Sequence, residues 1–109
     1  MAYDEGLATR VRDLIGGQPR LAEKKMFGGL AFLLDGNMAC GVHGDELIVR
    51  LAADATDAAL VEPGTRLFDL TGRAMKGWIL VDAGGHAADD DLRRWIDRGV
   101  AYAHTLPPK

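Results

Sequence analysis

The chain has 109 residues, of which 48% are hydrophobic, and its 13 basic and 16 acidic residues give a net charge of −3 at pH 7. These values are typical of one globular domain with a single core, and the acidic balance argues against nonspecific nucleic-acid binding, which needs dense Lys and Arg. The apolar runs are shorter than the ~20 residues of a membrane-spanning helix, and the acidic N-terminus is unlike a signal peptide, so we expect a cytoplasmic protein without a membrane partner.

The first predicted element is an amphipathic helix over residues 3–15. Asp4 and Glu5 suit its N-terminal end, and the glycine pair after Ile15 predicts its C-terminal end. Its apolar residues recur at the spacing that places them on one helix face: Tyr3, Leu7, Val11, Leu14 and Ile15.

Residues 24–51 predict a three-stranded antiparallel meander. Two turn sequences divide this stretch, Asp35-Gly36-Asn37 and Gly44-Asp45, and we expect Gly36 and Asn37 to take the positive φ of a tight hairpin. Apolar residues alternate along the second and third strands, which predicts burial of one strand face only. The three strands are expected over residues 26–34, 38–43 and 46–51.

The remaining residues predict a short helix, two strands and a long terminal helix. Asp54 is expected to cap the short helix, and the acidic residues 89–91 are expected to cap the long one and to complement its dipole. The two strands would extend the same sheet and flank a loop over residues 71–77. The expected ranges are 55–61 for the short helix, 65–70 and 78–82 for the strands, and 92–106 for the long helix.

The resulting element order is α-β-β-β-α-β-β-α. Helices with one apolar stripe and strands with one apolar face predict a two-layer α+β domain over residues 1–109. We expect an antiparallel five-stranded sheet with the helices on one face.

Three motifs carry a resemblance to a known family. The sequences KKMFGG, DGNMACGV and MKGW occur in this order between the first and last predicted helices, and the chain ends in LPPK. With these motifs, essentially the whole chain resembles the TfoX/Sxy N-terminal domain family. The resemblance implies a secretion-chaperone-like α+β fold and a role in transcription regulation, because the family is known for bacterial competence regulators that act with the cyclic-AMP receptor protein. Full-length regulators carry a second, helical domain, so a sequence that stops at Lys109 resembles the stand-alone members.

A catalytic or metal site is the least favoured interpretation. Cys40 and His43 have a C-x-x-H spacing, but on one strand they point to opposite faces. His86 and the acidic residues 89–91 add ligand types without the paired local spacing of a structural zinc site. Burial in a strand is expected to raise the pKa of the Cys40 thiol and to lower its reactivity. We therefore predict no catalytic residue, cofactor or metal, and a small enzyme that uses Cys40 is the last alternative.

The basic loop from Arg73 to Trp78 is the main candidate site. Arg73 and Lys76 would contact an anion or an acidic partner, and Trp78 is expected to be half exposed. Lys24 and Lys25, with Arg66, would join this site if they lie near the same end of the sheet. The alternative is an ordinary solvated loop with surface charges.

These features predict a non-enzymatic regulatory or protein-interaction module. Its unidentified protein partner would bind at an exposed sheet edge or at the loop 73–78. The alternative is a weak nucleic-acid-binding domain that uses this loop, which the acidic net charge disfavours. Self-association into a homodimer through an edge strand is a further expectation for such a sheet.

Overall fold

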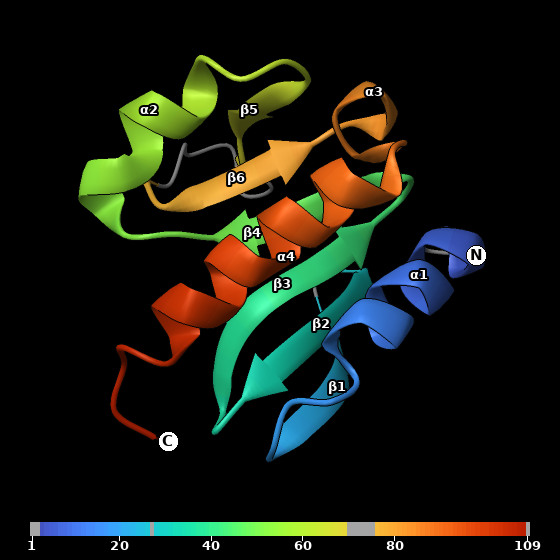
Figure 1. Cartoon of the computed structure of the whole chain (residues 1–109), viewed down its shortest axis with the longest axis vertical. Coiled ribbons are helices and arrows are strands. Elements are labelled where there is room, and N and C mark those ends of the chain that lie inside the picture. Colours follow the sequence, from blue (N-terminus) through green and yellow to red (C-terminus); the bar gives the residue numbers. More distant parts are fainter. Residues whose placement is uncertain (1–2, 27, 70–75, 109) are drawn as a thin grey trace.

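Six strands form one antiparallel sheet in the order β1-β2-β3-β4-β6-β5, in a computed structural model that describes residues 3–26, 28–69 and 76–108 (Figure 1). The strands are β1 Leu21–Met26, β2 Gly29–Leu34, β3 Asn37–His43, β4 Glu46–Arg50, β5 Thr65–Leu67 and β6 Trp78–Val81. The helices are α1 Glu5–Ile15, α2 Thr56–Leu60, α3 Ala83–His86 and α4 Asp89–Ala103, and a 3-10 turn, η1 Ala53–Ala55, precedes α2.

The main core lies between the sheet and the layer formed by α1, α2 and α4. Helix α4 crosses the middle of the sheet, and α1 lies beside it over β2 and β3 (Figure 1). Trp95, Ile96 and Phe32 are among the largest fully buried side chains of this core. The predicted α+β class with helices on one face is therefore confirmed, with six strands in place of five.

The additional strand is β1. The sequence pattern predicted one strand over residues 26–34, but Met26 pairs with Gly29, and Gly28 has a φ of +74°. The chain up to Met26 forms β1, and five of its six residues are exposed. A strand with few buried residues has no apolar alternation, so its sequence carries no clear strand signal.

The β2–β3 hairpin has its turn at Asp35 and Gly36, with φ values of 52° and 82°. The predicted positive φ at Asn37 is wrong, because Asn37 is the first residue of β3. Its side chain is buried and its Nδ2 donates a hydrogen bond to the carbonyl oxygen of Pro107 at 2.9 Å. The amide therefore holds the end of the chain against this hairpin.

Strands β3 and β4 are buried on both faces, whereas the sequence pattern predicted burial of one face. The face away from the helices carries a second apolar cluster, to which Phe68 contributes from the segment after β5. That contribution depends on tertiary structure, which strand periodicity does not report. The buried members of this second cluster are Ala31, Met38, Ile48, Phe68 and Leu80.

The helix ends follow the prediction only in part. Asp4 caps α1 by accepting hydrogen bonds from the amides of Gly6 and Leu7. Asp54 does not cap α2, because it lies inside the 3-10 turn that leads into that helix. The acidic residues 89–91 occupy the first turn of α4 after the N-cap Ala88, so they complement the helix dipole without capping the helix.

Candidate partner-binding surfaces

The predicted site residues lie in two separate places. Lys24 and Lys25 belong to β1, whereas Lys76 and Trp78 lie at the start of β6. Because β2, β3 and β4 separate these strands, the two groups are roughly 19 Å apart at the usual strand spacing. The structure therefore does not bring Lys24 and Lys25 together with Lys76 and Trp78. Arg73 lies outside the described residues.

Strand β1 presents a backbone edge. Met26 pairs with Gly29, only three positions further along the chain, so these two residues form the hydrogen-bonded pair that closes the hairpin. Pairing alternates along an antiparallel ladder, so Lys24 also pairs with β2 through its backbone, whereas Glu23 and Lys25 direct their N–H and C=O groups away from the sheet. These outward groups are free to pair with an added strand.

The side chains of β1 make this edge basic. Arg12 of α1 donates two hydrogen bonds to the Glu23 carboxylate at 2.7 and 2.8 Å, and these bonds lower the pKa of that carboxyl. Lys24 and Lys25 are exposed and form no ion pair with another residue of the described ranges. The negative charge at this edge is thus neutralised by α1, and two positive charges are left.

The opposite edge of the sheet is β5, which offers fewer backbone N–H and C=O groups to an added strand. It has only three residues, and Arg66 within it forms an ion pair with Glu46 of β4. Arg66 is therefore engaged within the sheet and does not join Lys24 and Lys25. Of the two edges, β1 is the longer.

A second surface surrounds Arg50, the last residue of β4. Arg50 pairs with Trp78 across the sheet, and its guanidinium carbon lies 5.0 Å from the centre of the Trp78 ring. The same carbon lies 5.6 Å from the ring centre of Tyr102 in the last turn of α4. Both distances fall within the range of cation–π interactions. All three side chains are partly exposed, as predicted for Trp78.

Gly77 fixes the position of Trp78. Its N–H donates to the hydroxyl of Thr56 at 2.7 Å, and its carbonyl oxygen accepts from the amide of Leu51 at 2.6 Å. Its φ is +87°, and a Cβ added there would lie 2.5 Å from the Leu51 carbonyl oxygen. The glycine of the MKGW motif is thus required by backbone conformation and by close packing.

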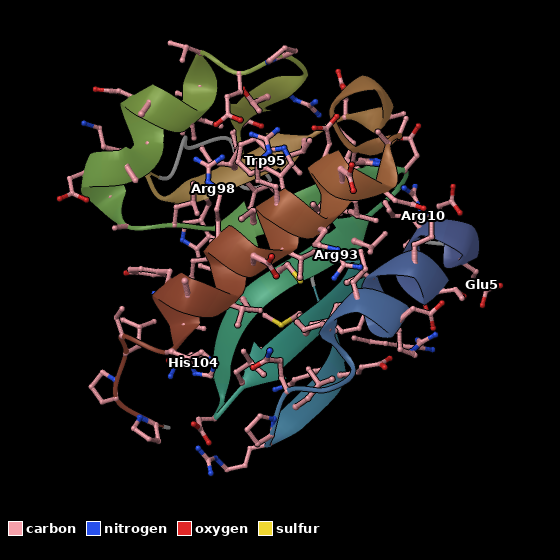
Figure 2. The ribbon with its side chains drawn as sticks, in the orientation of Figure 1. Glu5, Arg10, Arg93, Trp95, Arg98 and His104 are labelled. Carbon is pink, nitrogen blue, oxygen red and sulfur yellow. The ribbon has the colours of Figure 1, made fainter. Side chains whose placement is uncertain are left out.

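Helix α4 carries a neighbouring cluster of arginines, whose side chains already bind an acidic residue of the same chain. In Figure 2, Trp95 and Arg98 lie on the side of α4 that faces α2, and Arg93 lies on the side that faces α1. Arg98 stacks on Trp95 at 4.2 Å and binds Glu62 at 2.7 Å, and Arg94 binds the same carboxylate at 2.8 Å. These contacts join α4 to the end of α2.

Cys40 is fully buried in this fold. Its thiol lies in the main core, and burial raises its pKa to about 12. His43 lies on the other face, where its ring packs 6.3 Å from that of Phe68, and His86 Nε2 contacts the Asp45 carbonyl oxygen at 2.9 Å. Within residues 3–26, 28–69 and 76–108, no three His, Cys, Asp or Glu side chains group as a metal site.

Two small cavities flank α4. One, of about 180 Å³, lies between α1 and α4 and is lined by Arg10, Asp13, Leu14, Asp89 and Arg93. The other, of about 150 Å³, lies beside Trp95 and the Glu62–Arg94 pair. Both are below the ~300–1,000 Å³ of typical small-molecule sites.

No helix in the described part of the chain is both long and apolar enough to cross a membrane.

Arg50 and Tyr102 were not identified from the sequence. Arg50 ends a strand of alternating residues, and Tyr102 precedes the end of a helix, so each resembles an ordinary surface position. Their relationship depends on the pairing of β4 with β6 and on the path of α4 over the sheet, and no local pattern reports either one.

A family model described as the TfoX N-terminal domain matches residues 13–103 of the 109-residue chain. The matched range contains both β1 and the residues Arg50, Trp78 and Tyr102. No curated protein and no solved structure matches the chain.

Proposed function

The chain belongs to the TfoX N-terminal domain family, and from this premise we propose that it is a non-enzymatic regulatory module that acts by binding a protein partner. The family match supports a module of the kind found in competence regulators. The proposal places the module in the cytoplasm, where a thiol such as Cys40 stays reduced.

The exposed β1 edge is the observation that supports this proposal. An extended segment of the partner would add to the sheet as a seventh strand, and its backbone would pair with the outward N–H and C=O groups of Glu23 and Lys25. Lys24 and Lys25 would then contact side chains on the two faces of the added strand. Acidic residues in the partner segment would form ion pairs with both lysines.

A second copy of the chain fits this edge less well. In a symmetric antiparallel pair of β1 strands, a two-fold axis through Glu23, Lys24 or Lys25 places that residue opposite its own copy. An axis at Lys24 would also place Glu23 opposite Lys25 of the copy, but the Glu23 carboxylate is already bound to Arg12. Like charges directly opposite each other destabilise a strand pair. We therefore take the occupant to be an acidic segment of a different protein.

Two substitutions of Lys25 test the proposal. Lys25→Pro removes an outward N–H and leaves the β1–β2 hydrogen bonds in place, whereas Lys25→Ala removes only the charge. Tagged proteins of both kinds and the parent chain are used to capture partners from the native extract. A stoichiometric partner should be captured by the parent and, more weakly, by Lys25→Ala, and lost with Lys25→Pro.

Equal capture by Lys25→Pro, or no stoichiometric partner with any of the three proteins, would contradict strand addition at β1. Light scattering on the purified proteins gives a further check. A dimer of the parent chain that dissociates in Lys25→Pro would assign the edge to a second copy instead.

A further inference from the structure

We propose that Arg50, held by Trp78 and Tyr102, is a binding site for a carboxylate side chain of an acidic protein partner. The site is separate from β1, because β2 and β3 lie between β1 and β4, the strand that Arg50 ends. The inference rests on the proposed function only in taking the partner to be a protein.

The guanidinium N–H groups of Arg50 have no acceptor among the described residues. Ion pairs with acidic side chains engage most described arginines, but Arg50 forms neither a hydrogen bond nor an ion pair with another described residue. A guanidinium that stacks over rings through its face keeps its five N–H donors in its plane, at its edges. Those edges match the two oxygens of a carboxylate.

The rings also hold the guanidinium in advance of binding. Trp78 packs against Phe68 at 6.4 Å and is anchored in the backbone through Gly77, and Tyr102 belongs to a rigid helix. An arginine that is already ordered loses less side-chain entropy when it binds. Trp, Tyr and Arg are also the residue types that dominate binding energy at protein interfaces.

Two features favour an acidic protein segment over a nucleic acid. The chain has a net charge of −3, which opposes the approach of a polyanionic backbone. Moreover, Trp78 and Tyr102 already contact the guanidinium, and Trp78 also packs against Phe68, so the two rings are not an open platform for successive bases. Binding one carboxylate requires less positive charge on the protein than binding a nucleic-acid backbone. Arg50 supplies one such charge, and Lys76, exposed two residues before Trp78, supplies another.

The test is an NMR titration of the full chain, following the Arg50 Nε–H and Trp78 indole N–H signals. Capped hexaglutamate is the probe, and capped hexaglutamine, inorganic phosphate and a twelve-residue oligothymidylate are the comparison ligands. Hexaglutamate should shift both signals, and Arg50→Gln should weaken its affinity at least about tenfold. Arg50→Lys should also weaken it, because an ammonium keeps the charge and lacks the planar fork.

Arg93→Gln is the matched control, since Arg93 is exposed on the far side of α4 and has no acidic partner among the described residues (Figure 2). It should leave the hexaglutamate affinity unchanged. Unmoved Arg50 and Trp78 signals at saturating hexaglutamate would overturn the inference without requiring any variant to fold. Tighter binding of the oligonucleotide, or equal binding of free phosphate, would overturn the assignment to a protein carboxylate. Shifts confined to β1 would support the proposed function and overturn this second site.

Discussion

Gly99 of α4 lies directly against the carbonyl oxygen of Ala39 in β3, so close that a Cβ at position 99 would collide with that oxygen. Ala39 is the residue at which the β2–β3 register shifts, because Leu33 pairs with Met38 and Phe32 pairs with Cys40. The bulge and the glycine together bring α4 onto the sheet, and this contact sets the position of Tyr102 one helical turn later.

Gly99→Ala should therefore destabilise the fold. Alanine favours a helix by about 1 kcal/mol over glycine, but the clash with backbone forces α4 away from β3, so a net loss of about 1–3 kcal/mol is expected. Gly17→Ala is the control, since a Cβ there meets no atom within 4 Å. Urea unfolding of both variants measures the difference, and an unchanged midpoint for Gly99→Ala would contradict the close packing.

The Cys40 thiol should make stability fall at alkaline pH. Its pKa is about 12 in the folded chain, against 9.0 for an ordinary thiol, so the folded state keeps a proton that the unfolded state releases. The contribution is complete below about pH 9 and decreases by up to ~1.4 kcal/mol per pH unit between the two pKa values. Unfolding free energies of the parent and Cys40→Ala at pH 8 to 10 measure it. Parallel pH profiles of the two proteins, or rapid labelling of the native thiol, would refute this prediction.

Glu62 should contribute stability that is lost in acid. Burial raises the pKa of Glu62, but hydrogen bonds from Arg98 and Arg94 outweigh it and lower the pKa below its ordinary value. The contribution is therefore complete above the ordinary glutamate pKa and disappears as pH falls through the lower folded value. Because the arginines are partly exposed, the expected loss in Glu62→Gln at pH 7 is below about 1 kcal/mol. Chemical unfolding of both proteins should show a larger difference in stability at pH 7 than at pH 3.

Adjacent prolines in β1 should have different effects. Lys24→Pro removes an N–H that pairs with β2 opposite Ala31, so a loss of roughly 1 kcal/mol or more is expected, whereas Lys25→Pro affects an outward N–H and should cost less. Thermal unfolding compares the two variants directly. A greater loss in Lys25→Pro would show that the outward and inward assignments are reversed.

The Thr56 hydroxyl should be needed to hold the start of β6. Thr56→Val preserves shape but leaves the buried Gly77 N–H without its acceptor, at a cost of about 1–3 kcal/mol. Thr9→Val, at an exposed position of α1, should change stability by less than about 0.5 kcal/mol. Equal unfolding midpoints for the two variants would argue against this anchor.

The sequence predicted those elements whose burial is periodic. The apolar stripe on α4 and the apolar alternation in β3 predicted both elements and the buried Cys40, although β3 is buried on its second face as well. Strand β1 was missed, since an exposed edge strand needs no apolar pattern. Asp54 was misassigned as a cap because a 3-10 turn precedes α2.

The candidate sites were harder to predict than the fold. The lysines of β1 were named from sequence, but their separation from Lys76 follows from the strand order, which places β6 beside β4. The same strand pairing puts Arg50 opposite Trp78, and the path of α4 adds Tyr102. Long-range pairing decides both surfaces, and a single sequence does not contain it.

Hydrogen exchange of the backbone amides in the captured complex tests the central claim most directly. If a partner strand adds to β1, the amides of Glu23 and Lys25 should become protected in the complex, while those of Lys24 and Met26, already paired with β2, should change little. Unprotected amides at Glu23 and Lys25 in a saturated complex would contradict strand addition and show that the partner binds elsewhere.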